Sequence, residues 1–590
     1  MQDSDSWTVS QLLGVSVWLV ALLIVPVSMA LALWLRQRYV KAVVRLQSGA
    51  APAPAAQRDA AYASERAVAP PLQIVVQASR GGQQDAGSAN ALGVRRKVLR
   101  AQFICGLLFW WAALACVYTA LVNAPGLVEA KSPAAAAEGD WVGYFGWVLL
   151  LAPSLVAWAM QAGVARRYLW SALGAVAVVL TAVIAIDSKD WRTAALVASV
   201  LSGLAMLIAV LLSVRMRGAG PTLVAALSLG AVLWLALIGV TVTLLPDGPD
   251  GPAGSPVFDA RGLAQLAWLI VHTVAALGAA VWTLYWIARR YEAKAFSEVQ
   301  LAFTAYWGLV ALLALGVVLL PAFMEVPANV AGPVFWLAIS WLAFGAWLKL
   351  WLRRIARRAP PSLGALLLLR VFKGAAISEA FMDRFLSYWR FAAPVWMIGG
   401  ADLAGANMEP DEFFALIRRR LGDKFLLTTE QIAAHIARLD AARDPDARFR
   451  VNELFCAEAT WKPAVLALIA RAAVVVLDLR EYNPRRAGTR YEIFQLMNLT
   501  PLERVVVLIG ASDDEAAIGA ELQAAWSAMD GSSPNRRHGA ATLSILRLGS
   551  DSVSEIRALV IAIAQATARA TAVSPAGTDS PGSRALTARA

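Results

Sequence analysis

The chain has 590 residues, of which 59% are hydrophobic and 16% charged, and its formal net charge is +12. Soluble globular proteins carry about 25% charged residues, so this composition excludes a soluble class for the chain as a whole. The character of the sequence changes near Pro360, where long apolar stretches give way to a segment of ordinary globular composition. The sequence therefore predicts a polytopic α-helical membrane region that carries one soluble α/β domain.

Nine apolar stretches precede Pro360, and each is close to the length of about 20 residues that a helix needs to cross a bilayer. The first forms region 1–46 together with its basic flank, and the other eight form a helical bundle over 101–358. We predict these transmembrane helices at about 10–35, 101–123, 141–163, 168–186, 193–214, 221–245, 263–287, 299–322 and 334–352.

Basic residues gather in alternate connections between these stretches. One set of connections contains Arg36, Arg38, Lys41, Arg45, Arg95, Arg96, Lys97, Arg100, Arg166, Arg167, Arg215, Arg217, Arg289, Arg290, Lys294, Arg353, Arg354, Arg357 and Arg358. The opposite set contains only Lys131, Lys189, Arg192 and Arg261. Positive residues stay on the cytoplasmic side during insertion. We therefore predict a bacterial inner-membrane protein with its N-terminus outside and its soluble domain in the cytoplasm. The partner of these clusters would be anionic lipid rather than nucleic acid.

Two segments have a composition typical of disorder. Residues 47–100 are rich in Ala, Pro, Gln, Gly and Ser and poor in aromatic residues. Such a segment buries too little apolar surface to order itself, so we expect a disordered cytoplasmic loop, with 75–77 as the only candidate for a short strand. The tail at 573–590 gives the same expectation.

The predicted spans contain few groups suited to transport. No carboxylate lies near mid-membrane depth, and His272 is the only basic side chain well inside a span. Its imidazole would either be neutral and hydrogen-bonded between helices or serve as a proton or ligand site. A transporter or channel with a regulatory cytosolic domain is therefore one alternative function. The three cysteines and three histidines do not have the spacing of a metal site, so no metal is expected.

The soluble domain, predicted at 360–572, alternates compact apolar runs with helical patterns. The strands are expected at 366–372, 394–399, 472–479, 505–510 and 543–548. Continuous apolar strands separated by helices indicate a parallel sheet covered on both faces, a flavodoxin-like α/β sandwich. Ligands bind such sheets at the carboxyl ends of the strands. This rule selects the candidate ligand-binding residues Arg370, Lys373, Gly399, Gly400, Asp478 and Arg480.

One strand end carries a recognisable pattern. The run AAVVVLDLREYNPRRAGTRYEIFQL at 472–496 resembles the strand, loop and following helix of Toll/interleukin-1 receptor (TIR) domains and of nucleoside 2-deoxyribosyltransferases. Gly488, Thr489 and Glu492 match the G-T-x-x-E pattern of the transferases. The resemblance implies chemistry at an N-glycosidic bond, with Glu492 as the catalytic residue and Gly488 and Thr489 beside the ligand. A carboxylate suits this role because it stabilises the positive charge that develops on the sugar when the base departs.

Two patterns in this domain have alternative interpretations. Thr489 and Glu492 also have the spacing of a capping box, which would place them at a helix start without any catalytic role. Arg448 and Arg450 would either clamp an anionic ribose phosphate or pair with the nearby Asp444, Asp446 and Glu453.

Three functions follow from these observations. The first is an inner-membrane protein whose TIR-like domain binds a nucleotide or associates with copies of itself in signalling or defence. The second is an enzyme that cleaves NAD or a nucleoside through Glu492, and the third is the transporter or channel. No cofactor is assigned beyond NAD or another nucleotide, as ligand or substrate, and the other partner is the lipid bilayer.

Overall fold

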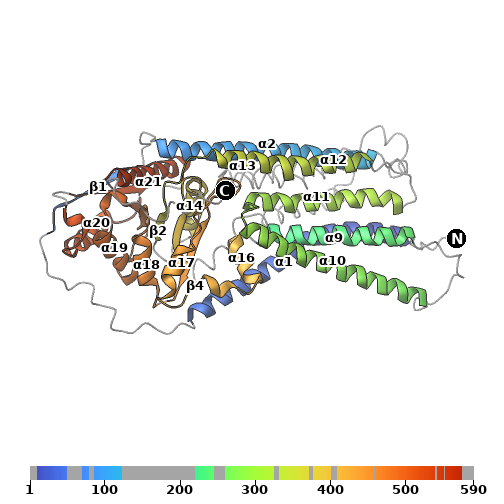
Figure 1. Ribbon diagram of the computed structural model, residues 1–590, viewed down its shortest axis with the longest axis horizontal. Helices are drawn as coiled ribbons and strands as arrows, with labels where there is room; N and C mark the ends of the chain where they lie inside the picture. Colours follow the sequence, from blue (N-terminus) through green and yellow to red (C-terminus); the bar gives the residue numbers. More distant parts are fainter. Residues whose placement is uncertain are drawn as a thin grey trace, which may run out of the picture.

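The computed structural model describes residues 9–48, 69–78, 86–122, 219–244, 260–323, 331–370, 376–399, 408–457, 459–537, 541–549 and 552–573. Long helices run together along the long axis of the molecule, and the α/β layers lie at one end (Figure 1). These long helices are α1 (Val9–Ser48), α2 (Ala86–Val122), α9 (Ala219–Leu244), α10 (Ala260–Glu292), α11 (Glu298–Phe323) and α12 (Ala331–Trp341).

Three helical segments in the described ranges are long and apolar enough to cross a membrane: Ala219–Ile238, Ala267–Glu292 and Ala331–Arg357. The third runs from α12 through the π-helix η4 (Leu342–Leu348) into α13 (Lys349–Arg357). Helix α10 exposes a continuous apolar surface, which includes Trp268, Leu269, Ile270, Val271, Val274 and Leu277. Exposed apolar surface of this kind is suited to lipid, so the protein is membrane-associated.

The predicted count of nine transmembrane helices is not supported. The three segments above correspond to the spans predicted at 221–245, 263–287 and 334–352. The spans at 10–35, 101–123 and 299–322 fall within the helices α1, α2 and α11, which do not meet the same criteria over their described residues. The spans at 141–163, 168–186 and 193–214 lie outside the described residues. The orientation, which depended on an odd number of crossings, stays a prediction.

An eight-stranded, entirely parallel sheet forms the core of the α/β domain, as the apolar runs predicted. Its order is β1-β8-β7-β6-β2-β3-β5-β4. The central strands β3, β2, β6, β7 and β8 have the 2-1-3-4-5 order of flavodoxin-like sheets. The strands are β1 (Leu72–Ala78), β2 (Leu366–Arg370), β3 (Val395–Gly399), β4 (Phe425–Leu426), β5 (Val451–Cys456), β6 (Val474–Asp478), β7 (Val505–Gly510) and β8 (Ala541–Leu548).

Helices cover both faces of this sheet, because its central strands are apolar on both sides. One face packs against α14 (Ala376–Trp389) and α21 (Val553–Val573), through side chains that include Phe381, Phe385, Ile556 and Leu559. The other face packs against α18 (Trp461–Ile469), α19 (Ala487–Leu499) and α20 (Glu515–Ser527), through Val465, Ile493, Leu496 and Leu522. Residues on β6 alternate between these two cores, as a strand requires.

The expectation that residues 47–100 are disordered is wrong for the two parts that the structure describes. Strand β1 pairs with β8 along its whole length, from Leu72 opposite Ala541 to Ala78 opposite Arg547. Helix α2 already begins at Ala86. The segment as a whole has a low apolar content, although it contains a seven-residue strand. Backbone hydrogen bonds to the edge of the sheet stabilise this strand. Residues 49–68 and 79–85 lie outside the described residues.

We expect Ile74→Asp to loosen this edge of the sheet. Ile74 is half-buried and packs against the core beneath β1 and α20, so a carboxylate there would lower the free energy of unfolding by about 1–3 kcal/mol. Gln73 is exposed on the same strand, and Gln73→Asp is the matched control. Hydrogen exchange of β8 amides reports the difference. Equal protection in the two variants would show that β1 does not support β8.

A shared apolar core joins the long helices to the α/β domain. Buried side chains from the helices meet buried side chains from the domain in one continuous cluster. The rings of Tyr291 on α10 and Phe414 on α16 (Pro410–Ile417) lie 5.4 Å apart. The helices contribute Tyr39, Val43, Ile287, Tyr291, Leu352 and Ile355, and the domain contributes Phe391, Phe413, Phe414, Phe425 and Phe455. The two parts therefore share interior surface instead of being joined by a linker alone.

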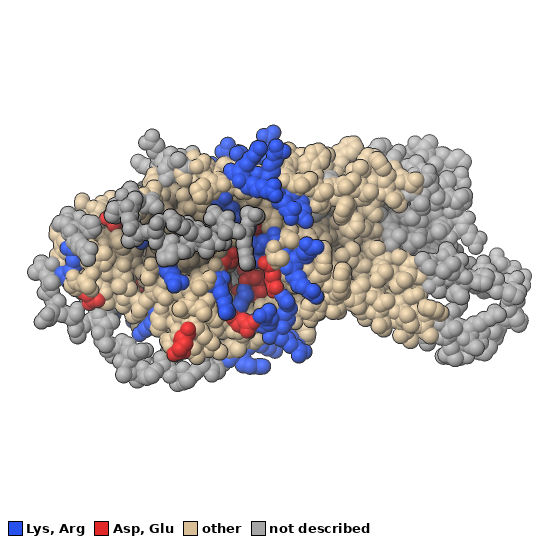
Figure 2. All heavy atoms as spheres, viewed as in Figure 1, with Lys and Arg blue, Asp and Glu red and all other residues tan. Residues whose placement is uncertain are grey.

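Charged side chains form a band across the middle of the molecule, between the α/β layers and the long helices (Figure 2). Basic side chains predominate in this band, and acidic side chains lie among them on the side of the domain. The ends of α1, α10 and α13 contribute Arg38, Lys41, Arg45, Arg289, Arg290, Arg353, Arg354 and Arg357. The helices that carry these clusters therefore present them at the end where the domain lies.

Candidate functional site

From β2 the chain adds β3 on one side of the sheet, whereas from β6 it adds β7 and β8 on the other side. The boundary between β2 and β6 is therefore the switch point of the sheet. The connection after β2 leads into α14 on one face, whereas the connection after β6 leads into α19 on the other face. In sheets of this topology, ligands bind outside the carboxyl ends of the strands at the switch point. Arg370, the last residue of β2, lies directly opposite Asp478, the last residue of β6.

Asp478 and Arg480 form a buried ion pair at this edge. The guanidinium of Arg480 donates two hydrogen bonds to the carboxylate, from Nε to Oδ1 at 2.8 Å and from Nη2 to Oδ2 at 2.6 Å. The same guanidinium lies 4.0 Å from the ring centre of Phe381 on α14. Two parallel bonds and a stacked ring fix the planar group in one orientation. The edge therefore holds the guanidinium group of Arg480 in one orientation, with its charge balanced by Asp478.

Arg370 also acts on a half-buried carboxyl group in the middle of β5. Burial raises the pKa of Glu453 to about 7, the charge of Glu409 raises it further, and the positive charge of Arg370 opposes the rise. Arg370 therefore lies close enough to influence the charge of Glu453. The sequence did not single out Glu453 as a titrating group. Lys373 and Gly400 lie outside the described residues.

Gly399 has a packing role at the end of β3. A Cβ atom at this position would lie 2.8 Å from the ring of Phe455 on the neighbouring strand. Gly488 is different, because a Cβ atom there would be in ordinary contact with Trp461, at 3.7 Å. The packing therefore excludes a larger residue at Gly399 but accepts a Cβ atom at Gly488.

We expect Gly399→Ala to lower the free energy of unfolding by about 1–3 kcal/mol, because the added methyl group overlaps a buried ring. Gly488→Ala is expected to be neutral or to stabilise the protein by up to about 1 kcal/mol, since Gly488 lies within a helix and its surroundings accept a methyl group. Urea unfolding of the two variants measures both effects. Equal stabilities would show that β3 and β5 separate to accommodate the methyl group without cost.

The capping-box interpretation of Thr489 and Glu492 is wrong. Helix α19 begins at Ala487, and its N-cap is Arg486, which makes no side-chain cap. Thr489 is therefore the third residue of the helix and Glu492 the sixth, too far along to cap the first turn. Both side chains are buried, with Glu492 only 3% exposed. Burial raises the pKa of Glu492 to about 8, so its carboxyl group is largely protonated at neutral pH.

Aromatic and basic side chains surround the beginning of α19. The rings of Trp461 and Tyr491 meet nearly at right angles, with their centres 5.4 Å apart. The ammonium group of Lys462 lies 4.9 Å from the centre of the Tyr491 ring. Only the packing of α18 beside α19 brings Trp461, Lys462 and Tyr491 together, so no local sequence pattern shows this group.

The structure thus divides the predicted site residues into two groups. Arg480 contacts Phe381 and Met382 of α14, so the group of Arg370, Asp478 and Arg480 belongs to the α14 face of the sheet. Gly488, Thr489 and Glu492 belong to α19, which covers the opposite face. The predicted site residues that the structure describes are therefore associated with helices on both faces of the sheet, and their common role in one site stays a prediction.

Arg448 and Arg450 pair with acidic neighbours, as the second of their two interpretations predicted. Arg448 Nε donates to Asp446 at 2.7 Å, and Arg450 Nε donates to Asp444 at 3.0 Å. Arg450 also donates to the backbone carbonyl of Tyr291 on α10, at 2.7 Å. These bonds occupy the guanidinium groups and connect the domain to the long helices.

A buried ion pair strengthens the same connection. Arg390, after α14, donates to Glu298 at the start of α11 with an Nη2 to Oε1 distance of 2.7 Å, and both side chains are less than 10% exposed. Arg390 Nε also donates to the carbonyl of Phe449 at 2.7 Å. We use the term ionic junction for the residues Glu298, Arg390, Asp444, Asp446, Arg448 and Arg450. It fixes the domain against the loop between α10 and α11.

Among the residues that the structure describes, no three His, Cys, Asp or Glu side chains form a group that could hold a metal ion. His272 is buried in α10 with its ring 5.7 Å from that of Trp268, and its role in transport stays a prediction.

No protein-family model, curated protein or solved structure matches this chain. The structure itself defines a broad class: a membrane-associated protein in which apolar helices share a core with a parallel α/β domain. Within this class, the site that the geometry assembles best is the carboxyl edge around Asp478 and Arg480.

Proposed function

We propose that this is an integral protein of a bacterial inner membrane whose cytoplasmic α/β domain binds a nucleotide-class anion in signalling or defence. The observation that carries the proposal is the Asp478–Arg480 pair at the switch point of a flavodoxin-like sheet. A phosphate group placed above this edge would meet the outer face of the Arg480 guanidinium and the side chain of Arg370. Both groups recognise oxyanions through directed N–H bonds.

The cytoplasmic location is supported by the distribution of charge. The basic clusters at the ends of α1, α10 and α13 lie in the band beside the domain (Figure 2). Basic clusters are retained in the cytoplasm during membrane insertion, which favours the same compartment for the domain and its nucleotide ligands.

The attachment of the domain gives ligand binding a route to the membrane. The shared apolar core and the ionic junction connect β3 and β5 to α10 and α11. A ligand that binds one arrangement of the domain more tightly than another would therefore also favour one arrangement of the helices. The size of this shift is set by the difference in its affinity for the two arrangements of the domain. TIR-like self-association of the domain would use the same connection.

The proposal is tested with the full chain in detergent, by calorimetric titration with ATP, GTP and NAD. We expect one of these to bind, and Arg480→Gln to weaken its binding by about tenfold or more, the effect of losing a charge-assisted bond. Arg438→Gln is the control, because Arg438 is exposed on α17 (Gln431–Ala437), away from the edge. Equal affinities of both variants for every probe would contradict the proposal. Light scattering of the same samples tests self-association.

A second candidate function is cleavage of an N-glycosidic bond at Glu492. The specific observation that favours it is a buried carboxyl group whose position capping does not explain. In the reaction the bond from C1′ to the base nitrogen breaks, its electron pair leaves with the base, and water supplies the new oxygen and releases a proton. A carboxylate beside C1′ would stabilise the developing positive charge.

Release of nicotinamide from NAD, or of a base from nucleosides, tests this second candidate. If it is correct, Glu492→Gln reduces release by at least about a hundredfold, whereas Glu503→Gln leaves it unchanged. Because the pKa of Glu492 is raised to about 8, activity in the wild-type protein should increase as the pH rises through 8. Absence of release at pH 9 would leave only the binding proposal.

A further inference from the structure

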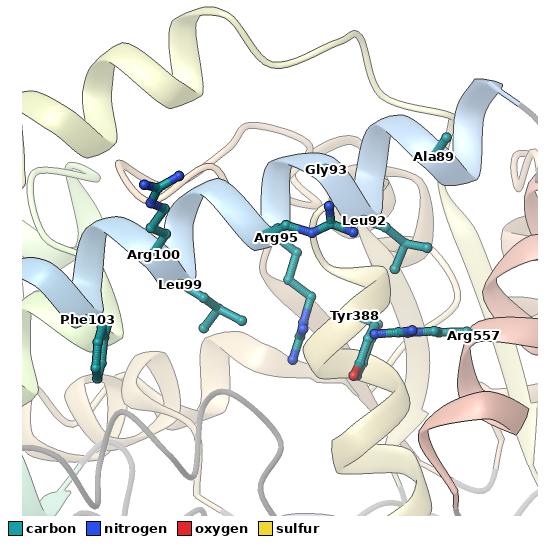
Figure 3. Close-up of a pocket in the computed structure, with 10 residues that line it drawn as sticks. Ala89, Leu92, Gly93, Arg95, Leu99, Arg100, Phe103, Tyr388 and Arg557 are labelled. Carbon is teal, nitrogen blue, oxygen red and sulfur yellow. The ribbon is translucent and has the colours of Figure 1, made fainter.

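A second, separate cavity lies between α2 and the α/β domain. It has a volume of about 540 Å³ and opens between three helices, α2, α14 and α21 (Figure 3). Its lining includes none of the residues of the carboxyl edge. The residues that surround it are Ala89, Leu92, Gly93, Arg95, Arg96, Leu99, Arg100, Phe103, Tyr388 and Arg557.

The charge around this cavity has a single sign. Four arginines line it, and among the residues that the structure describes no acidic side chain does. Arg95 extends from α2 toward α14, and Arg557 reaches from α21 toward Tyr388 (Figure 3). Arg96 and Arg100 are exposed and lie at its rim. An anion in the cavity would reduce the repulsion between these charges.

Arg95 is held in position at the inner wall. It is only 8% exposed, its guanidinium carbon lies 3.7 Å from the centre of the Tyr388 ring, and its Nε donates to the carbonyl of Ser387 at 3.3 Å. Burial lowers the pKa of Arg95, and the neighbouring charge of Arg557 lowers it further. Arg95 therefore holds its charge at a fixed position on the inner wall, with the charge of Arg557 close by.

The position of the cavity along α2 indicates where its ligand comes from. The basic part of α2 precedes the span predicted at 101–123, and Phe103 at the mouth of the cavity is exposed. Leu108 and Trp111 further along the helix are exposed as well. With α2 crossing the membrane over the predicted span 101–123, the mouth would open at the boundary between water and lipid, and basic pockets at this depth suit the head groups of anionic lipids.

We infer that the cavity between α2, α14 and α21 is a binding site for a phosphate-bearing anion, with Arg95 and Arg557 as the groups that contact the phosphate. The phosphate belongs either to the head group of an anionic lipid or to a soluble phosphate compound, and the cavity has room for both. Because α14 and α21 belong to the domain and α2 continues into the membrane region, the bound anion joins the two parts. This site is independent of the nucleotide site proposed above.

Native mass spectrometry of the full chain in detergent tests the inference with two probes, phosphatidylglycerol and inorganic pyrophosphate. We expect at least one probe to bind, and Arg557→Gln to weaken its binding by about tenfold. Arg557 is exposed, so this substitution does not disturb a core. Arg557→Lys keeps the charge and should retain part of the affinity. Arg569→Gln, at an exposed arginine on the same helix outside the cavity, is the matched control.

The outcomes separate the two sources of phosphate. Phosphatidylglycerol that binds in an Arg557-dependent manner and is not displaced by pyrophosphate identifies a lipid site, whereas pyrophosphate that binds in an Arg557-dependent manner identifies a site for a soluble phosphate. Either result supports the inference. It is overturned if neither probe binds, or if the binding observed is unaffected by Arg557→Gln or is reduced equally by Arg557→Gln and Arg569→Gln.

Discussion

Arg390→Met is expected to lower the free energy of unfolding of the α/β domain by about 3–5 kcal/mol, because it leaves the buried carboxylate of Glu298 without its closest cation. The loss should also weaken the attachment of the domain to α11, since this pair connects the two parts. Urea unfolding of the full chain in detergent, followed by the fluorescence of the buried Trp389 next to Arg390, measures the effect.

Two further variants make this prediction specific. Arg420→Ala removes an ion pair with Asp423 in which both side chains are more than 60% exposed, and it should change stability by less than about 1 kcal/mol. The double variant Arg390→Met with Glu298→Met removes both buried charges and should recover most of the lost stability. A double variant no more stable than Arg390→Met would show that this ion pair does not control the junction.

Glu492→Gln is expected to stabilise the protein at alkaline pH. The pKa of Glu492 is about 8 in the folded protein, against a value near 4.5 for an unperturbed glutamate. The folded state therefore retains a proton that the unfolded state releases between these two values. By linkage, the free energy of unfolding of the wild-type protein falls as the pH rises from about 4.5 to about 8.

The variant carries no ionisable group at this position, so it should lose this part of the pH dependence. Each unit of pKa shift corresponds to about 1.4 kcal/mol of free energy. We therefore expect the free energy of unfolding of the variant to exceed that of the wild-type protein by roughly 2–4 kcal/mol at pH 8.5 and by almost nothing at pH 4. Urea unfolding at the two pH values provides the comparison, with Glu503→Gln as the control. If the advantage of Glu492→Gln were equal at both pH values, the carboxyl group would not be protonated by burial.

The central strands could be predicted from the sequence because they are buried on both sides. β2, β6 and β7 are uninterrupted apolar runs, the pattern that a covered parallel sheet requires. β5 was missed because Asn452 and Glu453 interrupt its apolar residues, and the structure gives the amide of Asn452 a partner in the carbonyl of Asp440, 3.0 Å away. Only 75–77 of β1 was considered as a strand, because β1 depends on β8, which lies more than 460 residues later in the chain.

The candidate site was predictable only in part. The rule that ligands bind at strand ends selected Asp478 and Arg480, but their position at the switch point depends on strand order, which no local pattern contains. The helix that bears Glu492 was expected to start at residue 489. Its actual start at Ala487 changed the meaning of the Thr489–Glu492 spacing. The cavity lined by Arg95 and Arg557 joins residues more than 450 positions apart, so only tertiary packing shows it.

The contribution of β1 to the sheet has a consequence for biosynthesis. The ribosome makes this strand before the helices that follow it, and its partner β8 is made only after more than 460 further residues. Until β8 is made, β1 has no strand to pair with. β1 in turn covers the edge of β8, which would otherwise be open to pairing with other chains. A fragment that starts after Pro360 lacks this cover and should aggregate, so studies of the domain should keep residues 69–78 with it.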